Sequence, residues 1–548
     1  MFGNGDLMKK IMLITFMLSL GIIIGLFVQP SISGDNVYGN IKKFQTVFNT
    51  AYSNYVKEVD SDKLTEEAIK GMLNTLDVHS VYISPEEKKE VDEDFQGHFF
   101  GIGIQFDIIQ DTITVISPLS GGPSEKLGIS ALDKIVMIDG ENAVGIPRND
   151  VPRKLKGPKD TKVTVDIKRN GVDTLIHFEI IRDKIPDWSL DSRFMIDGTD
   201  IGYVKFSRFS ATTHIEMMEA VAELKAKGMK NLIIDLRYNP GGYLSQAYLM
   251  AQEFLNAGDT IVYTRGRKSE FNEELIAKNN GSLRDLPLVV LINQNSASAS
   301  EIVSGAMQDL DRGIIVGETS FGKGLVQRQY DLEDGSGFRI TISYYYTPTG
   351  RSIQRPFEDG EAYRSLEGRL DLADGSTLED ALEELKKLKK DSKENIDSLI
   401  FFTKKGRKVF AGGGITPDYI IKGDTSKLQE MTVKIRMSRI TTIFADHYLN
   451  GSGNFIQTKF NDFSEFFKNF NLDKKAWSEF KQIVIENDIE WVEEDFQKDK
   501  DYLQTLIMAD ISNIRWSRHE QRQMYTKFDR QLSEAIKLFP KAKKLVNK

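Results

Sequence analysis

The stretch LVVLINQNSASASE, residues 288–301, decides how the centre of this chain folds. Its apolar first part, residues 288–292, predicts a buried strand, and the small hydroxylated residues after it predict the start of a helix. Ser298 therefore falls at a strand-to-helix junction, where backbone N–H groups without helical partners can stabilise an anion. An acyl-transfer nucleophile suits this position. Most serine-rich helix starts are only N-caps, so the interpretation needs support from other segments.

A second segment, SFGKGLVQ at residues 320–327, supplies a candidate base. It follows another apolar strand pattern, and glycines on both sides of Lys323 let the backbone pass close to a neighbour. A lysine with a pKa of about 10.4 is protonated at neutral pH. Burial must lower that pKa by roughly 3 units, about 4 to 5 kcal/mol, before the amine can accept a proton. Phe321, Leu325 and Val326 provide apolar neighbours, and Gln327 can orient the amine without adding a counter-charge.

A third segment, NLIIDLRYNPGG at residues 231–242, has a buried-strand pattern that ends in a pair of glycines. Backbone N–H groups of Gly241 and Gly242 could be presented to an oxyanion. The three segments together predict a serine peptidase that uses lysine in place of histidine.

Rival motifs overlap the same lysine. Residues 317–323 match G-x-x-x-x-G-K, but Gly324 stands where a phosphate-binding loop needs Ser or Thr. Residues 320–323 match S-x-x-K, which requires both residues on one helical turn, and the flanking glycines disfavour that helix. The chain has no cysteine, and its six histidines form no zinc motif. We expect neither a metal nor a cofactor.

Further motifs in the same order resemble the carboxy-terminal processing, or tail-specific, proteases. They are LNTLDVHS at 73–80, YTPTGRSIQ at 346–354 and GGITPD at 413–418, and the resemblance covers roughly residues 40–425. It implies that Ser298 is the nucleophile, Lys323 the base and Gln327 the group that orients the lysine. It also implies an oxyanion hole made by the Ala299 N–H with Gly241 or Gly242, and the sequence does not decide between the two glycines.

The segment FGIGIQF, residues 100–106, resembles the carboxylate-binding loop of a PDZ domain. In such a loop, successive N–H groups hold a peptide C-terminus while the peptide adds a strand to the sheet edge. The implied binding residues are Phe100, Gly101, Ile102, Gly103 and Ile104. The PDZ pattern continues to about Arg182, with Leu132 where the usual motif has glycine.

The predicted domains follow from these patterns. Residues 1–33 contain Lys9, Lys10 and an apolar run at 11–28, which predicts a signal peptide or an N-terminal membrane anchor. A helical region at 34–96 shows Phe44, Val47 and Tyr52 at helical spacing, which favours a core or dimer contact. The other predicted parts are a PDZ domain at 97–183, a peptidase core at 184–425 with a charged insertion near 355–400, and a helical C-terminal domain at 426–548.

We therefore expect a multidomain α/β fold whose peptidase core is crotonase-like, as the resemblance implies. The expected enzyme is exported, lies in the cell envelope on the periplasmic side, and is anchored in the inner membrane or secreted across it. Its expected partners are proteins with exposed, unstructured C-terminal tails, with an adaptor protein and a homo-oligomer as further possibilities. A net charge of −8 argues against nucleic acid. The alternatives are a catalytically silent PDZ scaffold and a nucleotide-binding protein that uses residues 317–323.

Overall fold

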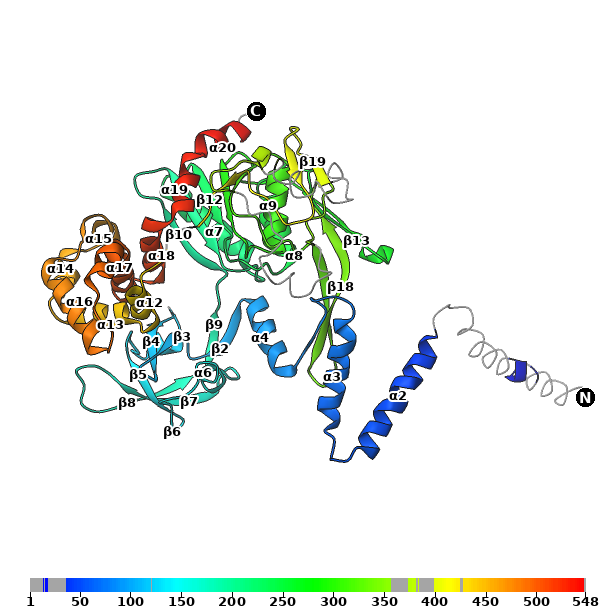
Figure 1. The fold of residues 1–548 in the computed structure, drawn as a ribbon, viewed down its shortest axis with the longest axis horizontal. Coiled ribbons are helices and arrows are strands. Elements are labelled where there is room, and N and C mark those ends of the chain that lie inside the picture. Colours follow the sequence, from blue (N-terminus) through cyan, green and yellow to red (C-terminus); the bar gives the residue numbers. More distant parts are fainter. Residues whose placement is uncertain are drawn as a thin grey trace, which may run out of the picture. The chain divides into compact units, whose positions relative to one another are not determined.

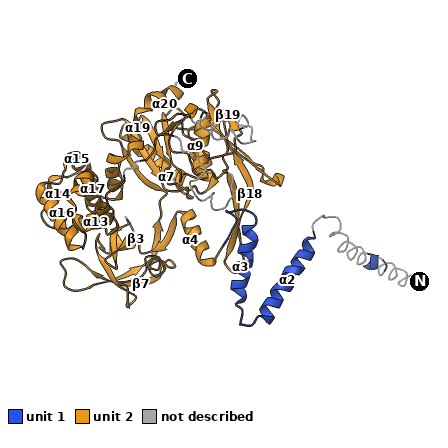
Figure 2. Ribbon diagram, viewed as in Figure 1, with its two compact units in different colours: residues 1–82 blue, residues 83–548 orange. Residues whose placement is uncertain are grey.

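The computed structural model describes residues 13, 15–17, 36–119, 121–355, 373–380, 383, 399–423 and 427–546. The chain forms two compact units, residues 1–82 and 83–548 (Figure 2). The predicted export segment at 1–33 lies almost wholly outside the described residues, and so does the larger part of the charged insertion near 355–400. Among the helices that are described, none combines the length and hydropathy needed to cross a bilayer.

The described part of the first unit consists mainly of helices α2 (Val37–Asn54) and α3 (Ser61–Asn74). Asp60 caps α3 by accepting hydrogen bonds from the Asp62 and Lys63 N–H groups. Helix α2 buries no residue, and the Phe44 side chain is 56% exposed. The core contact expected for the face with Phe44, Val47 and Tyr52 is therefore wrong for this chain, and the dimer contact stays a prediction.

The predicted PDZ domain is built on one antiparallel sheet with strand order β3-β4-β5-β7-β8. Alternating side chains such as Ile113, Val115, Val163 and Val165 fill its core. Helix α4 (Pro85–Gln96), which starts with a Ser84–Glu87 capping box, precedes a two-stranded ribbon of β2 (His98–Gly101) and β9 (Asp183–Pro186) at the ends of this domain. The remaining elements are β3 (Ile104–Ile109), β4 (Thr112–Pro118), α5 (Pro123–Lys126), β5 (Lys134–Ile138), β6 (Glu141–Asn142), α6 (Val151–Leu155), β7 (Lys162–Lys168) and β8 (Ile176–Ile181).

The predicted peptidase core, drawn mainly in green in Figure 1, contains a six-stranded sheet, and its strand order is β10-β11-β12-β15-β16-β21. Only β10 runs antiparallel to its neighbour, and Ile234, Val290 and Ile315 stand side by side in register across the parallel strands. Their face packs against helices α7, α8 and α9. The bounds are β10 (Leu190–Met195), β11 (Ile201–Phe206), α7 (Thr213–Ala226), β12 (Asn231–Asp235), α8 (Leu244–Gln252), β15 (Leu288–Ile292), α9 (Ala299–Asp309), β16 (Ile314–Gly317) and β21 (Tyr419–Ile420). The predicted α/β class is confirmed.

A second, antiparallel sheet adjoins the core and carries the segment after Lys323. In it β18 (Gly337–Tyr346) pairs with both β17 (Leu325–Asp331) and β13 (Thr260–Gly266), and β13 also pairs with β14 (Glu274–Ile276). A short hairpin joins β19 (Ile400–Phe402) and β20 (Lys408–Phe410), and a 3-10 turn covers Ser269–Phe271.

The C-terminal region is helical, as predicted. Its own core gathers aromatic side chains, including Phe444, Phe466 and Phe480. The helices are α12 (Glu430–Met437), α13 (Ile440–Asn450), α14 (Ile456–Lys459), α15 (Phe463–Asn469), α16 (Lys474–Glu486), α17 (Glu493–Arg515), α18 (Arg518–Tyr525), α19 (Arg530–Lys537) and α20 (Phe539–Val546), with a 3-10 turn at Thr526–Phe528. Helices α19 and α20 leave this core and pack on the second face of the six-stranded sheet.

Candidate active site

Ser298 lies where β15 gives way to α9, at the N-cap of the helix. Its backbone adopts φ +55° and ψ −112°, a conformation that residues other than glycine rarely adopt. The side chain is half-buried, and the Ala299 N–H that follows it starts the helix. The sharp turn therefore holds Ser298 at the positive end of a helix, as the sequence predicts.

Lys323 lies in the loop between β16 and β17. Its Nζ donates a hydrogen bond of 2.7 Å to Oε1 of Gln327, which stands on β17. The structure thus brings together the predicted base and the amide predicted to orient it. A strand follows this loop, whereas a nucleotide-binding loop of the type considered leads into a helix, so the geometry disfavours the nucleotide-binding alternative.

One tyrosine links the loops of Ser298 and Lys323. Tyr345, on β18, is 1% exposed, and its hydroxyl lies 2.7 Å from the Lys323 carbonyl oxygen and 3.2 Å from the Ser298 carbonyl oxygen. A single O–H shared between these two acceptors fixes the backbone of one loop against the other. Sequence reasoning missed Tyr345, because it stands on a strand whose partner loops are distant in the chain.

Glu301 is a second residue that sequence reasoning did not assign to the site. Its side chain is fully buried and accepts four hydrogen bonds. Oε2 accepts from the Ser298 N–H at 2.7 Å and the Lys323 N–H at 2.9 Å, and Oε1 accepts from the Gly322 N–H at 2.7 Å and the Ser320 hydroxyl at 2.5 Å. Burial raises the pKa of the Glu301 carboxyl above its ordinary value, although these hydrogen bonds oppose the shift.

The glycine pair after β12 lies against Ser298. A Cβ atom on Gly241 would stand 2.8 Å from the Ser298 Cβ, and one on Gly242 would stand 2.1 Å from the Phe209 carbonyl oxygen, so both positions require glycine. The Gly241 N–H donates to Asn239 Oδ1 at 2.9 Å. Within the described part of the chain, the N–H groups of Gly242 and Ala299 donate no hydrogen bond. This geometry favours Gly242 over Gly241 as the donor that pairs with Ala299.

The loop predicted to bind a carboxylate is a tight turn between β2 and β3. Phe100 and Gly101 end strand β2, Ile102 and Gly103 form the turn, and Ile104 starts β3. Gly103 has φ +75°, and the Ile102 carbonyl accepts hydrogen bonds from the Ser124 N–H and hydroxyl, which fixes the turn. Strand β3 pairs only with β4, so one edge of it is open to an added strand among the described elements.

The described residues contain no group of three His, Asp or Glu side chains arranged to hold a metal ion. Glu301 and Tyr345 tie the loops of Ser298 and Lys323 together, and these loops with β17 supply a hydroxyl, an amine, an amide and backbone N–H donors. Such a set is suited to nucleophilic acyl transfer.

The fold and the site together define a serine-type peptidase with an attached PDZ domain, and comparison with known proteins agrees. The model of peptidase family S41 matches residues 200–359, and the PDZ model matches residues 90–168. The model of the N-terminal domain of the activating protease CtpB matches residues 29–87, and a family of unknown function matches residues 432–517.

Individual relatives narrow the assignment. The carboxy-terminal-processing protease of Bartonella bacilliformis is 39% identical over 323 residues, which is 58% of this chain and 74% of that protein. The carboxy-terminal processing protease CtpA of Bacillus subtilis is 35% identical over 327 residues, 59% of this chain and 68% of that protein. A solved photosystem II D1 C-terminal processing protease aligns at 28% identity and TM-score 0.33, over 58% of this chain and 86% of that one. The chain belongs to the carboxy-terminal processing proteases of family S41.

Proposed function

We propose that the protein is an exported endopeptidase that cleaves protein substrates near their C-termini with a Ser298/Lys323 dyad, and that its PDZ domain gates this activity. The observation that supports the dyad is that the same two side chains bind both the Ser298 loop and the Lys323 loop. Glu301 accepts hydrogen bonds from the N–H groups of both residues, and the Tyr345 hydroxyl bridges their carbonyl oxygens.

In the proposed reaction, the neutral Lys323 amine takes the proton from the Ser298 hydroxyl as its oxygen attacks the scissile carbonyl carbon. The developing oxyanion is stabilised by the N–H groups of Ala299 and Gly242, with Gly241 as the other candidate donor. The protonated amine then gives its proton to the leaving amide nitrogen, and an acyl-enzyme remains on Ser298. Water, deprotonated by Lys323, hydrolyses this ester and restores the free serine.

Gln327 suits the role of orienting residue. Its amide oxygen accepts a hydrogen bond from the lysine and fixes the direction of the amine. An uncharged amide favours the protonated amine less than a carboxylate would, because it adds no full negative charge beside the nitrogen. A carboxylate at this position would raise the lysine pKa and reduce the fraction of neutral base.

The substrate tail would be captured by the PDZ domain. The loop from Phe100 to Ile104 faces the terminal carboxylate with backbone donors, and the open edge of β3 pairs with the extended peptide. Two connections could transmit binding to the core. One is the ribbon of β2 and β9, and the other is the ion pair of 2.7 Å between Asp107 on β3 and Arg439 at the start of α13.

Export, residence in the cell envelope on the periplasmic side and membrane attachment through residues 1–33 remain part of the proposal. They rest on the apolar run at 11–28 and on the two lysines that precede it. The exposed α2 face that contains Phe44 supports a homo-oligomer contact. An adaptor protein could use the helical C-terminal domain.

The test measures cleavage of fluorescein-labelled β-casein by the full-length enzyme. Ser298→Ala and Lys323→Ala should each abolish turnover, and the double variant should be no worse than either, because residues that act as a unit lose activity non-additively. Lys468→Ala, which removes an exposed ion pair with Asp197, is the matched control and should keep wild-type activity. More than a few per cent of residual activity in Lys323→Ala contradicts the dyad.

A further inference from the structure

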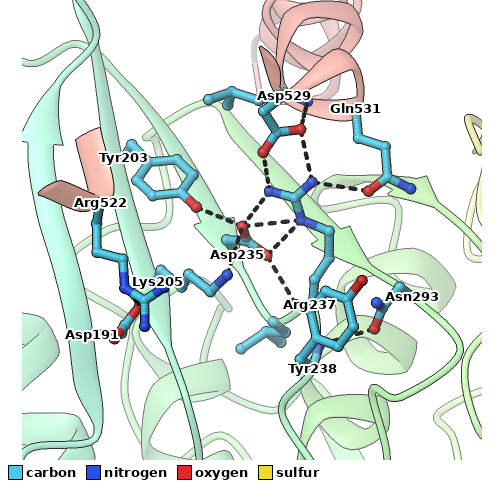
Figure 3. A network of polar contacts seen from close by, with 12 residues as sticks. Asp191, Tyr203, Lys205, Asp235, Arg237, Tyr238, Asn293, Arg522, Asp529 and Gln531 are labelled. Atoms are coloured by element: carbon cyan, nitrogen blue, oxygen red, sulfur yellow. Dashed lines mark hydrogen bonds and ion pairs between the residues drawn. The ribbon is translucent and has the colours of Figure 1, made fainter. Parts of the chain in front are cut away.

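Two residues of the C-terminal segment, Asp529 and Gln531, bind an arginine that lies just before the loop with the two glycines. Arg237 follows β12 and is clamped between two carboxylates, Asp235 on one side and Asp529 on the other (Figure 3). Its Nη1 donates to Asp529 Oδ1 at 2.8 Å and to Gln531 Oε1 at 2.9 Å, while Nε lies 3.0 Å from both Asp235 oxygens. The Arg237 side chain is 8% exposed. Asp529 therefore supplies one half of a buried, bidentate arginine clamp.

The clamp combines residues of the catalytic sheet with residues of the C-terminal segment. Asp235 also accepts a hydrogen bond of 2.5 Å from the Tyr203 hydroxyl, and Lys205 Nζ stands 3.9 Å away. Burial by itself would raise the pKa of Asp235, but the charges of Arg237 and Lys205 outweigh it and hold the pKa at about 2. With Asp235 ionised, Arg237 forms a charged link between the catalytic sheet and the C-terminal segment.

The residues after Arg237 are hydrogen-bonded to the segment that contains Ser298. Tyr238 has φ +64°, and its N–H donates to Asn293 Oδ1 at 2.9 Å, in the loop that carries the nucleophile. The Asn239 carbonyl accepts from the Ala297 N–H at 3.0 Å and from the Ser300 hydroxyl at 2.9 Å. The conformation of residues 237–242 thus fixes where the two glycines stand relative to Ser298.

We propose that Arg237 is a positioning residue for the oxyanion-binding loop, and that Asp529 of the C-terminal segment is the residue that holds it in place. The inference rests on the proposed function, since it assigns a role to the loop that carries Gly241 and Gly242. It also assigns a role to the end of the chain, where the match to peptidase family S41 does not extend. The C-terminal segment is then a structural part of the active site.

The attachment of the segment does not depend on the clamp. Helices α19 and α20 bury Leu532, Ala535, Phe539 and Ala542 against Ile233, Val289 and Leu291 of the sheet. Asp529 also caps α19, because its Oδ1 accepts a hydrogen bond from the Leu532 N–H at 2.9 Å. Asparagine caps helices as well as aspartate does. Asp529→Asn therefore keeps the cap and the apolar contacts while it removes the charge that faces Arg237.

The experiment compares kcat and KM of full-length wild type, Asp529→Asn and Lys541→Ala on fluorescein-labelled β-casein. Lys541 is the control, since it ties α20 to the Tyr419 hydroxyl at 2.8 Å without contacting the clamp. Displacing a catalytic donor by a fraction of an ångström to 1 Å costs on the order of tenfold to a hundredfold in rate. Asp529→Asn should lower kcat at least about tenfold with KM within about twofold, and Lys541→Ala should keep the wild-type kcat.

A second readout separates positioning from general destabilisation. The plateau of kcat/KM against pH should fall in Asp529→Asn while its midpoint stays, because the lysine base is untouched. Rates are compared at a temperature where all variants are native by circular dichroism. A wild-type kcat in Asp529→Asn, or an equal loss in Lys541→Ala, overturns the inference. Ser298→Ala is measured in parallel, and full activity in that variant would instead overturn the proposed function.

Discussion

Glu301 offers the sharpest test of how the two catalytic loops are held together. The change Glu301→Gln keeps the shape of the side chain but converts one acceptor oxygen into an N–H₂ donor. Each carboxylate oxygen accepts two of the four hydrogen bonds, so the two bonds to the replaced oxygen are lost. The two groups that donated them then face the new amide N–H₂ group, which is itself a donor. Hydrogen bonds to a charged group contribute about 1.5 to 3 kcal/mol each, so the gross loss is about 3 to 6 kcal/mol.

Removal of the buried charge offsets part of this loss, because burial raises the pKa of Glu301 and so penalises its ionised form. We expect a net fall of about 2 to 4 kcal/mol in the free energy of unfolding. If the amide nitrogen replaces Oε2, the Ser298 and Lys323 N–H groups lose their acceptor. If it replaces Oε1, the Gly322 N–H and the Ser320 hydroxyl, in the loop of Lys323, lose theirs. In either case kcat should fall by about tenfold or more.

The assay combines denaturant unfolding with kcat measured on β-casein for the native fraction. Glu216→Gln is the matched control. Glu216, on α7, is also buried, at 2% exposure, and accepts hydrogen bonds from the Ser189 hydroxyl and from the N–H of Leu190, the first residue of β10. This variant should lose comparable stability and keep its kcat. A wild-type kcat in native Glu301→Gln, or an equal kcat loss in the control, would refute the reasoning.

Three further outcomes are expected. The kcat/KM of the wild type should rise as pH is raised from about 5 to about 9, because Lys323 acts only as the neutral amine; a flat profile counts against a lysine base. An unstructured peptide that ends in alanine should be cut faster with a free than with an amidated C-terminus, mainly through KM, and equal rates would sink the PDZ proposal. The lowered pKa of Asp235, about 2, means that its stabilisation is present above its ordinary pKa near 3.8 and is lost as pH falls toward 2; this amounts to about 2 kcal/mol. Asp235→Asn should therefore weaken the loss of thermal stability between about pH 4 and pH 2, and an unchanged acid limb would contradict the assignment.

Much of the fold could be predicted from the sequence because the apolar strand patterns at residues 231–236, 288–292 and 313–317 are buried on both faces. Neighbouring parallel strands end at the same edge of a sheet, so the segments after β12, β15 and β16 meet there. The glycine pair, Ser298 and Lys323 each follow one of these strands. The strand patterns predict a parallel sheet, and the parallel sheet in turn predicts that these three segments lie close together.

The supporting residues could not be predicted in the same way, since their partners are set by tertiary packing. Glu301 three residues after Ser298 reads as a local capping box, and nothing local indicates that it also holds Gly322 and Lys323. The helical spacing of Leu532, Ala535 and Phe539 predicts an apolar helix face but not which surface covers it. The structure places that face on the catalytic sheet, away from the aromatic core of the helical domain.

The backbone of Ser298 explains why so many supports converge on it. A non-glycine residue at φ +55° and ψ −112° costs about 1 to 3 kcal/mol, and such a conformation persists only where its surroundings fix it. The Ser298 N–H donates to Glu301, its carbonyl accepts from the Glu301 N–H at 2.9 Å and the Ile302 N–H at 3.0 Å, and the next turn begins the buried helix α9. At about 1 kcal/mol for each hydrogen bond, these contacts offset the strain. Since the strain is balanced by these local contacts and by the Tyr345 hydroxyl of β18, 3.2 Å from the same carbonyl, loss of one of them should first displace Ser298 and only then unfold the helix. Substitution of a residue that contacts Ser298 should therefore lower kcat by a larger factor than it lowers the stability of the fold.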